Sequence, residues 1–359
     1  MEILNFIIPF FILITVVVFV HEYGHYYMAK KYGVGITDFS IGFGKELFGF
    51  KDNLGTRWKF CAIPLGGYVK FFGDRNVFSQ AEQEELLKKY KKEDQTKLFV
   101  TKPLYQRSLI VAAGPIANFL LAILIFTFIY IFSGKDFTPA YINEVQKDGP
   151  AYSVGIKSGD IIVSINDNKI SSVLDVSTFI NTSAKENIII RVLRNEMELD
   201  FQLSPKIIES VDSLGNKINK KIIGIKVAPP KNKLNKKKLG PATALFYAIK
   251  ETWFVTRTSL EFVISIFKGK GDTDQLGGPI KIAKITGQVA QLGVIAFLSI
   301  TAYISISLGF INLFPIPILD GGHLMFYAFE KVLGRPLTQK TQESFFRIGL
   351  FLLIFLMLF

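Results

Sequence analysis

Cysteine is almost absent from this sequence, since Cys61 is the only one among 359 residues. A lone thiol excludes an internal disulfide framework, and it cannot by itself build a zinc–thiolate site. Histidine is nearly as scarce, with three residues. Repeats of fixed period and nucleic-acid-binding motifs are also missing. We therefore interpret the net charge of +12 as suited to a membrane surface and expect no nucleic-acid partner.

Charge is missing from three long stretches, residues 3–20, 108–132 and 285–319. About 20 apolar residues in a helix span a bilayer, so we expect at least three transmembrane helices. The apolar tail, residues 348–359, is short, and a fourth span would have to start earlier and let Arg347 reach the headgroups. The first stretch lacks the basic start and the cleavage site of a secretory signal, and we interpret it as a span.

Lysine and arginine are unevenly distributed about these stretches, and their excess marks the cytoplasmic side of a membrane protein. If the spans alternate, one side carries Lys30, Lys31, Lys102, Arg107, Lys331, Arg335, Lys340 and Arg347, and the other carries Lys135, Lys281 and Lys284. We therefore expect the N-terminus to lie outside the cytoplasm. The basic run KNKLNKKK, residues 231–238, would also lie outside, as a solvated or headgroup-facing patch.

The segments between the predicted spans differ in composition. After the first span, alternating residues with Gly and Pro predict strands and hairpins, and the charged residues 81–97 predict a solvated linker. Residues 138–228 predict a small β domain, whose segment 149–170 resembles a PDZ domain, a module that binds extended peptides at a sheet edge. An unrelated β module that only packs on the membrane domain is the alternative. Residues 241–268 indicate an amphipathic helix on the membrane surface, or a short pair of core helices.

The first apolar run ends in HEYGH, which fits the pattern H-E-x-x-H. On a helix, His21 and His25 lie on one face and can bind one ion, and Glu22 can act as general base towards a water molecule. Zinc suits imidazole, and a catalytic zinc site needs three protein ligands and an open position. Ionisable side chains at membrane depth are costly, and they usually mark a functional site. A third ligand is therefore expected.

The third ligand follows from topology. The first and third spans run in the same direction, so the segment NLFPIPILDGGH, residues 312–323, is expected at the depth of HEYGH. We assign Asp320 as the third ligand, with His323 as its competitor. Asn312 could stabilise helix packing, or its amide could hold a substrate backbone or an oxyanion.

Taken in order, HEYGH, GPIAN at residues 114–118, a PDZ-like insert and NLFPIPILDGG resemble the site-2 protease family of intramembrane zinc metalloproteases, in its bacterial RseP type. The resemblance covers nearly the whole chain, although one PDZ-like unit is found where that type carries two, and the last span is short. It implies an α-helical polytopic membrane protein with about four transmembrane helices. A membrane-associated β hairpin region and an inserted small β-rich PDZ-like domain complete this fold class.

The resemblance implies a zinc metalloendopeptidase of regulated intramembrane proteolysis, in which Zn2+ is the cofactor. His21, His25 and Asp320 would bind zinc, Glu22 would activate water, and Asn312 would contact the substrate. The implied substrates are single-span membrane proteins, such as anti-sigma factors or signal-peptide-like segments. The implied place is the bacterial inner membrane, with the active site toward the cytoplasm and the PDZ-like domain outside.

The stretch PLGGYVK, residues 64–70, resembles the membrane-associated hairpin of that family, which would present the substrate as an extended strand. A transmembrane substrate must unwind locally before its carbonyls can be attacked, and a strand-like partner would satisfy the freed backbone groups. Gly66 and Gly67 would permit close backbone approach there. A PDZ-bearing membrane scaffold with a structural metal and a metal transporter are the alternative functions.

The expected order of parts follows from these observations. A first transmembrane helix with HExxH is expected at 1–30, followed by cytoplasmic-side hairpins and a charged segment at 31–106 and by a second transmembrane helix at 107–133. A PDZ-like domain at 138–228 and a basic linker with an interfacial helix at 229–284 come next. The chain then forms a third transmembrane helix with the NxxPxPxLDG segment at 285–330, and a short loop with a fourth transmembrane helix at 331–359.

Overall fold

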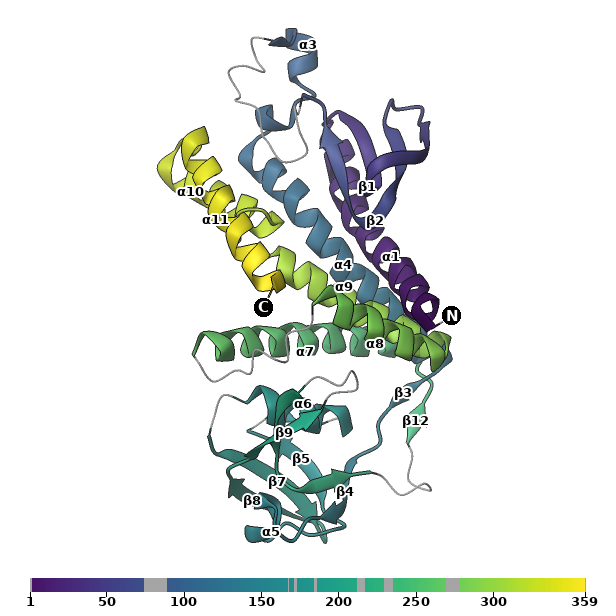
Figure 1. The fold of residues 1–359 in the computed structure, drawn as a ribbon, viewed down its shortest axis with the longest axis vertical. Coiled ribbons are helices and arrows are strands. Elements are labelled where there is room, and N and C mark those ends of the chain that lie inside the picture. Colours follow the sequence, from purple (N-terminus) through teal and green to yellow (C-terminus); the bar gives the residue numbers. More distant parts are fainter. Residues whose placement is uncertain are drawn as a thin grey trace. The chain divides into compact units, whose positions relative to one another are not determined.

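The computed structural model describes residues 2–358 except 74–88, 167, 171–172, 184–185, 212–216, 229–234 and 269–277 (Figure 1). The chain divides into two compact units, which we call the membrane unit, Met1–Ile125 with Ile282–Phe359, and the β unit, Phe126–Lys281. Residues 81–88 of the charged stretch predicted as a linker lie outside the described residues. The end of this stretch forms the short helix α3 (Lys92–Gln95).

The membrane unit is built mainly of long helices. Its elements are α1 (Glu2–Lys31), β1 (Ile36–Lys51), β2 (Arg57–Phe71), α3, η1 (Phe99–Thr101), α4 (Leu104–Phe132), α8 (Pro279–Gln291), α9 (Val294–Asn312), α10 (Asp320–Leu333) and α11 (Gln339–Leu358), of which α4 and α8 continue into the β unit. Three helices among the described residues are long and apolar enough to cross a membrane, namely Phe6–Lys31, Leu104–Phe132 and Val294–Asn312. This agrees with the expectation of at least three spans. The fourth span stays a prediction.

The third uncharged stretch, expected as one span at 285–330, is divided into several elements. Gly293, with φ of 108°, separates α8 from α9, because only glycine adopts this conformation without strain. The segment between α9 and α10 is irregular, since Pro315 and Pro317 lack the N–H groups that a helix needs. Asp320 is consequently the first residue of a new helix and not part of the span.

Helix α1 ends in a compact cap that turns the chain towards the β hairpin. Gly33 has φ of 66° and donates its N–H to the carbonyl of Lys30, and the N–H of Val34 donates to the carbonyl of Ala29. These two bonds form a Schellman motif, which satisfies carbonyls that the helix end leaves free. Strand β1 therefore starts directly beside the last turn of α1.

The hairpin of β1 and β2 is antiparallel and joined to α1 through Asp52. Its carboxylate accepts hydrogen bonds from the N–H groups of Leu54 and Thr56 within the turn, at 2.9 and 2.8 Å. It also accepts from the Trp58 indole and from the Tyr26 hydroxyl of α1, each at 3.1 Å. Burial raises the pKa of Asp52, but these donors outweigh it and lower the pKa below its usual value.

Apolar side chains of the hairpin, α1 and α4 form one core in the membrane unit. Its buried members are Tyr26, Ala29, Val34, Ile36, Phe39, Ile41, Phe99, Ile110, Val111 and Tyr327. Phe39 is completely buried and stacks edge-on against the rings of Phe19 and Tyr26. The hairpin is thereby fixed to the part of α1 that carries the HEYGH motif.

The β unit contains a small sheet of order β11-β4-β5-β7-β8, in which β6 also pairs with β5. Its elements are β3 (Lys135–Asp136), β4 (Ala140–Val145), α5 (Pro150–Ser153), β5 (Ile161–Ile165), β6 (Asn168–Lys169), α6 (Val173–Thr182), β7 (Ile188–Arg194), β8 (Met197–Leu203), β9 (Lys206–Val211), β10 (Lys217–Ile222), β11 (Ile225–Val227), β12 (Lys236–Lys237) and α7 (Pro241–Phe267). Buried Ile162, Ile165 and Ile190 of the sheet form the core with Val176 and Phe179 of α6. The predicted PDZ-like segment thus forms a compact β domain.

Helix α7 covers the region for which an amphipathic helix was expected, and it is a single helix. One face is buried at Ala244, Ala248 and Thr252. Another face exposes large apolar side chains, namely Leu245, Phe246, Ile249, Trp253, Leu260, Ile264 and Phe267. Half of the basic run preceding it, residues 231–234, lies outside the described residues. Helix α7 therefore has a buried face of small residues beside an exposed apolar face.

Candidate metal centre

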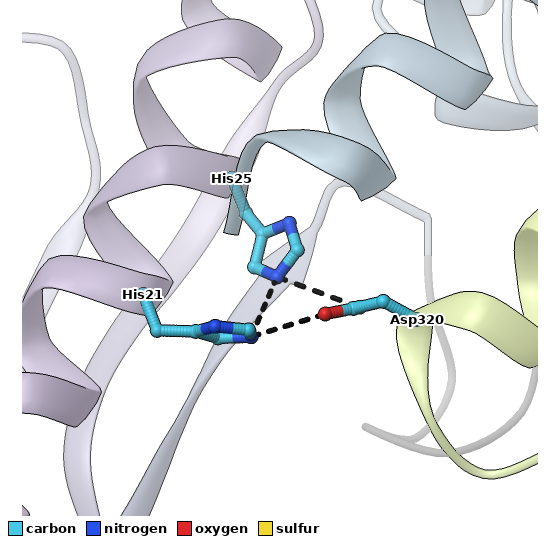
Figure 2. A group of neighbouring side chains, drawn as sticks. All are labelled: His21, His25 and Asp320. Atoms are coloured by element: carbon cyan, nitrogen blue, oxygen red, sulfur yellow. Dashed lines mark hydrogen bonds and ion pairs between the residues drawn. The ribbon is translucent and has the colours of Figure 1, made fainter. Parts of the chain in front are cut away.

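Three side chains from distant parts of the sequence converge in the membrane unit (Figure 2). His21 and His25 project from α1, and Asp320 projects from the start of α10. The His21 Nε2 atom lies 3.1 Å from one carboxylate oxygen of Asp320, and the His25 Nε2 atom lies 3.5 Å from the other. One potential ligand atom of each residue lies within 4.8 Å of the other two. The structure thus brings together the three residues that the sequence predicted as metal ligands.

The two histidines share one face because α1 is a continuous helix through the motif. Residues four apart lie one turn above each other, and the Nε2 atoms of His21 and His25 are 3.2 Å apart. Their rings stand nearly perpendicular, at 81°. Both nitrogens therefore face the same small space.

Glycines allow α1 and α4 to approach closely at this level. A Cβ atom on Gly24 would lie 2.3 Å from the carbonyl oxygen of Ala113, and one on Gly114 would lie 2.3 Å from Nε2 of His25. Neither distance is possible between real atoms, so both positions require glycine in this arrangement. Small residues at such contacts are typical of helices that pack in membranes.

Hydrogen bonds from α4 orient both imidazoles. The Nδ1 atom of His25 lies 2.9 Å from the carbonyl oxygen of Ile110, and the Nδ1 atom of His21 lies 3.2 Å from the side-chain amide of Asn118. Because Nδ1 contacts α4 in both rings, Nε2 is the nitrogen of each that faces Asp320. Metal-binding histidines in proteins are held in this manner through their second nitrogen.

Asp320 reaches the histidines through a tight turn before α10. A Cβ atom on Gly321 would lie 2.2 Å from the carbonyl oxygen of Phe314, and one on Gly322 would lie 2.3 Å from that of Ile316. The two glycines of the LDGG segment thus let the first turn of α10 fold back on the preceding chain. An acidic residue in the first turn also suits the positive end of the helix dipole.

An ion pair fixes α10 to α4 farther along. The Arg107 guanidinium binds both carboxylate oxygens of Glu330, at 2.5 and 3.1 Å, and lies over the ring of Tyr327, 5.1 Å from its centroid. Both charged side chains are less than one-fifth exposed. Bidentate pairs of this kind add geometric specificity as well as energy. The position of Asp320 therefore depends on contacts at both ends of its helix.

Glu22 lies on the neighbouring side of α1, towards the hairpin. Its side chain faces Gly67 of β2. A Cβ atom on Gly67 would lie 3.1 Å from Cγ of Glu22. Of the two glycines predicted to face substrate, Gly67 is thus beside Glu22. Gly66 has φ of 120°, and a Cβ there would lie 2.5 Å from the ring of Phe43.

His323 and Asn312 were also predicted to act at this site. His323 packs against the rings of Phe326 and Phe346, and the metal-binding group found among the described residues does not include it. The geometry therefore favours Asp320 over this competitor. Asn312 is the half-buried last residue of α9, and its predicted contact with substrate stays a prediction.

The donor set fits zinc. Two imidazole nitrogens and a carboxylate are ligands that zinc takes, and three protein ligands are typical of catalytic sites, which keep a further position open. The ring orientation agrees, because a neutral imidazole that carries its proton on Nδ1 presents a lone pair at Nε2. These residues therefore suit the ion as they stand.

Sequence reasoning missed the residues of α4 that support the histidines. Asn118 and Gly114 were quoted only as part of GPIAN, and neither was given a role. One signal was present, since Asn118 is a buried amide in an uncharged, predicted membrane span, where polar groups need partners.

Comparison with known proteins places this geometry in a family. The model of peptidase family M50 matches residues 9–356. A protein of Rhizobium meliloti named as a zinc metalloprotease is 40% identical over 357 residues and covers 99% of this chain and 95% of its own length. The metalloprotease MmpA of Caulobacter vibrioides is 35% identical over 367 residues, with 96% of this chain and 92% of its own covered.

Among solved structures, the PDZ domain of an SdrC-like protein from Listeria monocytogenes matches with a TM-score of 0.20 and 21% identity, over 25% of this chain and 87% of that domain. The corresponding PDZ domain from Listeria innocua has a TM-score of 0.21 and 20% identity, over 26% and 96%. The family match covers nearly the whole chain, and the relatives agree with it. The predicted resemblance and the predicted class of enzyme, a metalloprotease, are thereby confirmed, and the chain belongs to peptidase family M50.

Proposed function

We propose that this chain is an intramembrane zinc protease that hydrolyses peptide bonds of single-span membrane proteins. The observation that carries the proposal is the convergence of His21, His25 and Asp320 beside helices long and apolar enough to cross a membrane. In this proposal these three residues hold the zinc ion. When bound, zinc polarises the scissile carbonyl and lowers the pKa of water towards about 7.

Glu22 acts as the general base. Its carboxylate takes a proton from the attacking water as the water oxygen bonds to the scissile carbon, and it gives this proton to the leaving nitrogen as the C–N bond breaks. Its place in the H-E-x-x-H pattern, directly after His21 on α1, supports this role. Gly67 of β2 packs beside the side chain of Glu22.

The substrate approaches as an extended strand beside β2. A transmembrane helix hides its carbonyls in internal hydrogen bonds, so the segment to be cut must unwind and find new partners. A strand edge supplies such partners, and Gly67 places β2 next to Glu22 without an intervening side chain. Asn312, at the end of α9, holds the substrate backbone through its amide.

The proposed orientation of the chain in the membrane is based on the charges that flank the spans and on the exposed side chains of α7. The excess of basic residues on one side of the spans supports a metal centre toward the cytoplasmic side of a bacterial inner membrane. The β domain lies outside the cytoplasm and acts as a PDZ-like module. Helix α7 lies at the outer surface, with Trp253, Phe246 and Ile249 in the headgroup region.

Replacement of the general base tests the proposal. Glu22→Gln keeps the size of the side chain but removes its basicity, so it should abolish cleavage of a co-expressed single-span substrate while the zinc content of the purified protein stays the same. Glu261→Gln, the same change at a half-buried residue of α7 paired with Arg257, serves as control and should cleave normally. Cleavage by the Glu22→Gln protein, or a wild-type chain that holds no zinc, would contradict the proposal.

A further inference from the structure

Asn118 is an unusual residue at its position. It lies in the middle of α4, it is fully buried, and its side-chain amide faces Nδ1 of His21 at 3.2 Å. Its Oδ1 atom is buried without a hydrogen-bond partner among the described residues. A buried amide oxygen without a partner costs free energy, and such a group in a native protein calls for an explanation.

The proton on His21 supplies that explanation. A neutral imidazole that binds a metal through Nε2 carries its proton on Nδ1, which is then a donor. The Nδ2 group of Asn118 is also a donor, so with Nδ2 next to Nδ1 of His21 two donors would face each other. The oxygen and nitrogen of an amide are assigned from the hydrogen-bond network. A half-turn of the amide brings Oδ1 to Nδ1–H and gives the unpartnered oxygen its donor.

The surroundings hold Asn118 at this point and leave its side chain little freedom. Ser305 of α9 donates its hydroxyl to the backbone carbonyl of Asn118 at 2.8 Å, and both residues are buried. Gly309, one turn farther along α9, approaches so closely that a Cβ there would lie 3.2 Å from Cβ of Asn118. Helix α9 therefore packs closely against α4 at Asn118, the residue that contacts His21 of α1.

His25 shows the same arrangement with a different acceptor. Its Nδ1 atom lies 2.9 Å from the carbonyl oxygen of Ile110, two helical turns before Asn118 on α4. A backbone carbonyl can only accept, so it fixes the proton on Nδ1 and leaves Nε2 free. Asn118 would do the same for His21 through a side chain, which can be replaced by mutation.

We propose that Asn118 is a positioning residue that accepts a hydrogen bond from Nδ1–H of His21 through Oδ1 and thereby holds the ring with Nε2 turned to the metal. The inference rests on the proposed function, because it assigns His21 as a zinc ligand. Removal of such a supporting partner lowers metal affinity by about 10- to 100-fold in other metalloproteins.

Two variants separate this role from simple packing. Asn118→Leu keeps the size and removes the acceptor, so zinc affinity, measured with a chromophoric chelator on the full chain in detergent, should fall by roughly 10- to 100-fold. Asn118→Asp keeps an acceptor oxygen and should bind zinc at least as tightly as wild type. A packing role predicts the opposite order, because it tolerates leucine and not a buried charge.

A spectroscopic measurement on the wild-type protein does not depend on the folding of either variant. With only three histidines in the chain, 15N NMR of histidine-labelled, zinc-loaded protein should show His21 protonated at Nδ1, with that proton protected from exchange with water. Equal zinc affinity of the Asn118→Leu protein, loss of affinity in the Asn118→Asp protein, or an unprotonated Nδ1 would overturn the inference. If the wild-type chain binds no zinc, it is the proposed function that fails.

Discussion

Gly114→Ala tests whether the close approach of α1 and α4 builds the metal centre. The added Cβ would lie 2.3 Å from Nε2 and 2.5 Å from Cε1 of His25, and 2.9 Å from Cε1 of His21. Ordinary contact begins near 3.4 Å, so the rings or the helices must separate by about 1 Å. The His25 ring cannot swing away alone, because its Nδ1 atom is bonded to Ile110 of the same helix.

The magnitude follows from this displacement. A misplacement of about 1 Å in an active site can cost about 10²-fold in rate, and we expect at least that loss in cleavage of a single-span substrate, together with weaker zinc binding. Weakening of α4 itself would not explain the loss, since alanine favours a helix over glycine by about 0.8–1.0 kcal/mol. Gly240→Ala is the matched control, because a Cβ there meets nothing within 4 Å.

The assay compares the three proteins in one membrane preparation, with zinc affinity and cleavage rate measured side by side. The control should behave as wild type in both measurements. If the Gly114→Ala protein also binds zinc and cleaves as wild type, the close packing described for α1 and α4 is wrong.

Two further changes test other parts of the structure. Asp320→Asn should weaken zinc binding by roughly 10²-fold or more, whereas His323→Asn should leave it near wild type, and the reverse result would move the third ligand to His323. Arg194→Ala removes the partner of Asp160, whose side chain is 2% exposed, and should lower the opening free energy of β5 and β7 by about 3 kcal/mol in hydrogen exchange. Arg191→Ala, at an exposed pair, should change it by less than about 1 kcal/mol.

The converging residues could be predicted because they follow from short-range rules and topology. The spacing of His21 and His25 places both on one helix face, and the alternation of three spans brings the end of the third to the level of the first. Asp320 is the first acidic residue after a long uncharged stretch. Its place near the histidines therefore needs only the direction of each span, which hydropathy supplies.

The support of the site could not be predicted in the same manner. Gly114, Gly24 and Asn118 matter because of the distance between α1 and α4, and no periodicity in either helix encodes that distance. The break at Gly293 was also missed, because the end of α8, the break itself and α9 lie within one uncharged stretch. Composition predicts which residues lie in the lipid, whereas the points at which helices begin and end depend on backbone conformation.

Glu22 connects the hairpin with the metal centre. This residue follows His21 directly, and a Cβ atom on Gly67 of β2 would lie 3.1 Å from its Cγ atom. The hairpin is in turn fixed to α1 by the buried Phe39 and by the bond from Tyr26 to Asp52. A substrate strand that adds to β2 would therefore be aligned by the same strand that packs against the proposed general base. The position of the substrate and the position of the proton acceptor then depend on the same strand. A substrate strand bound out of register would not have its scissile carbonyl next to Glu22.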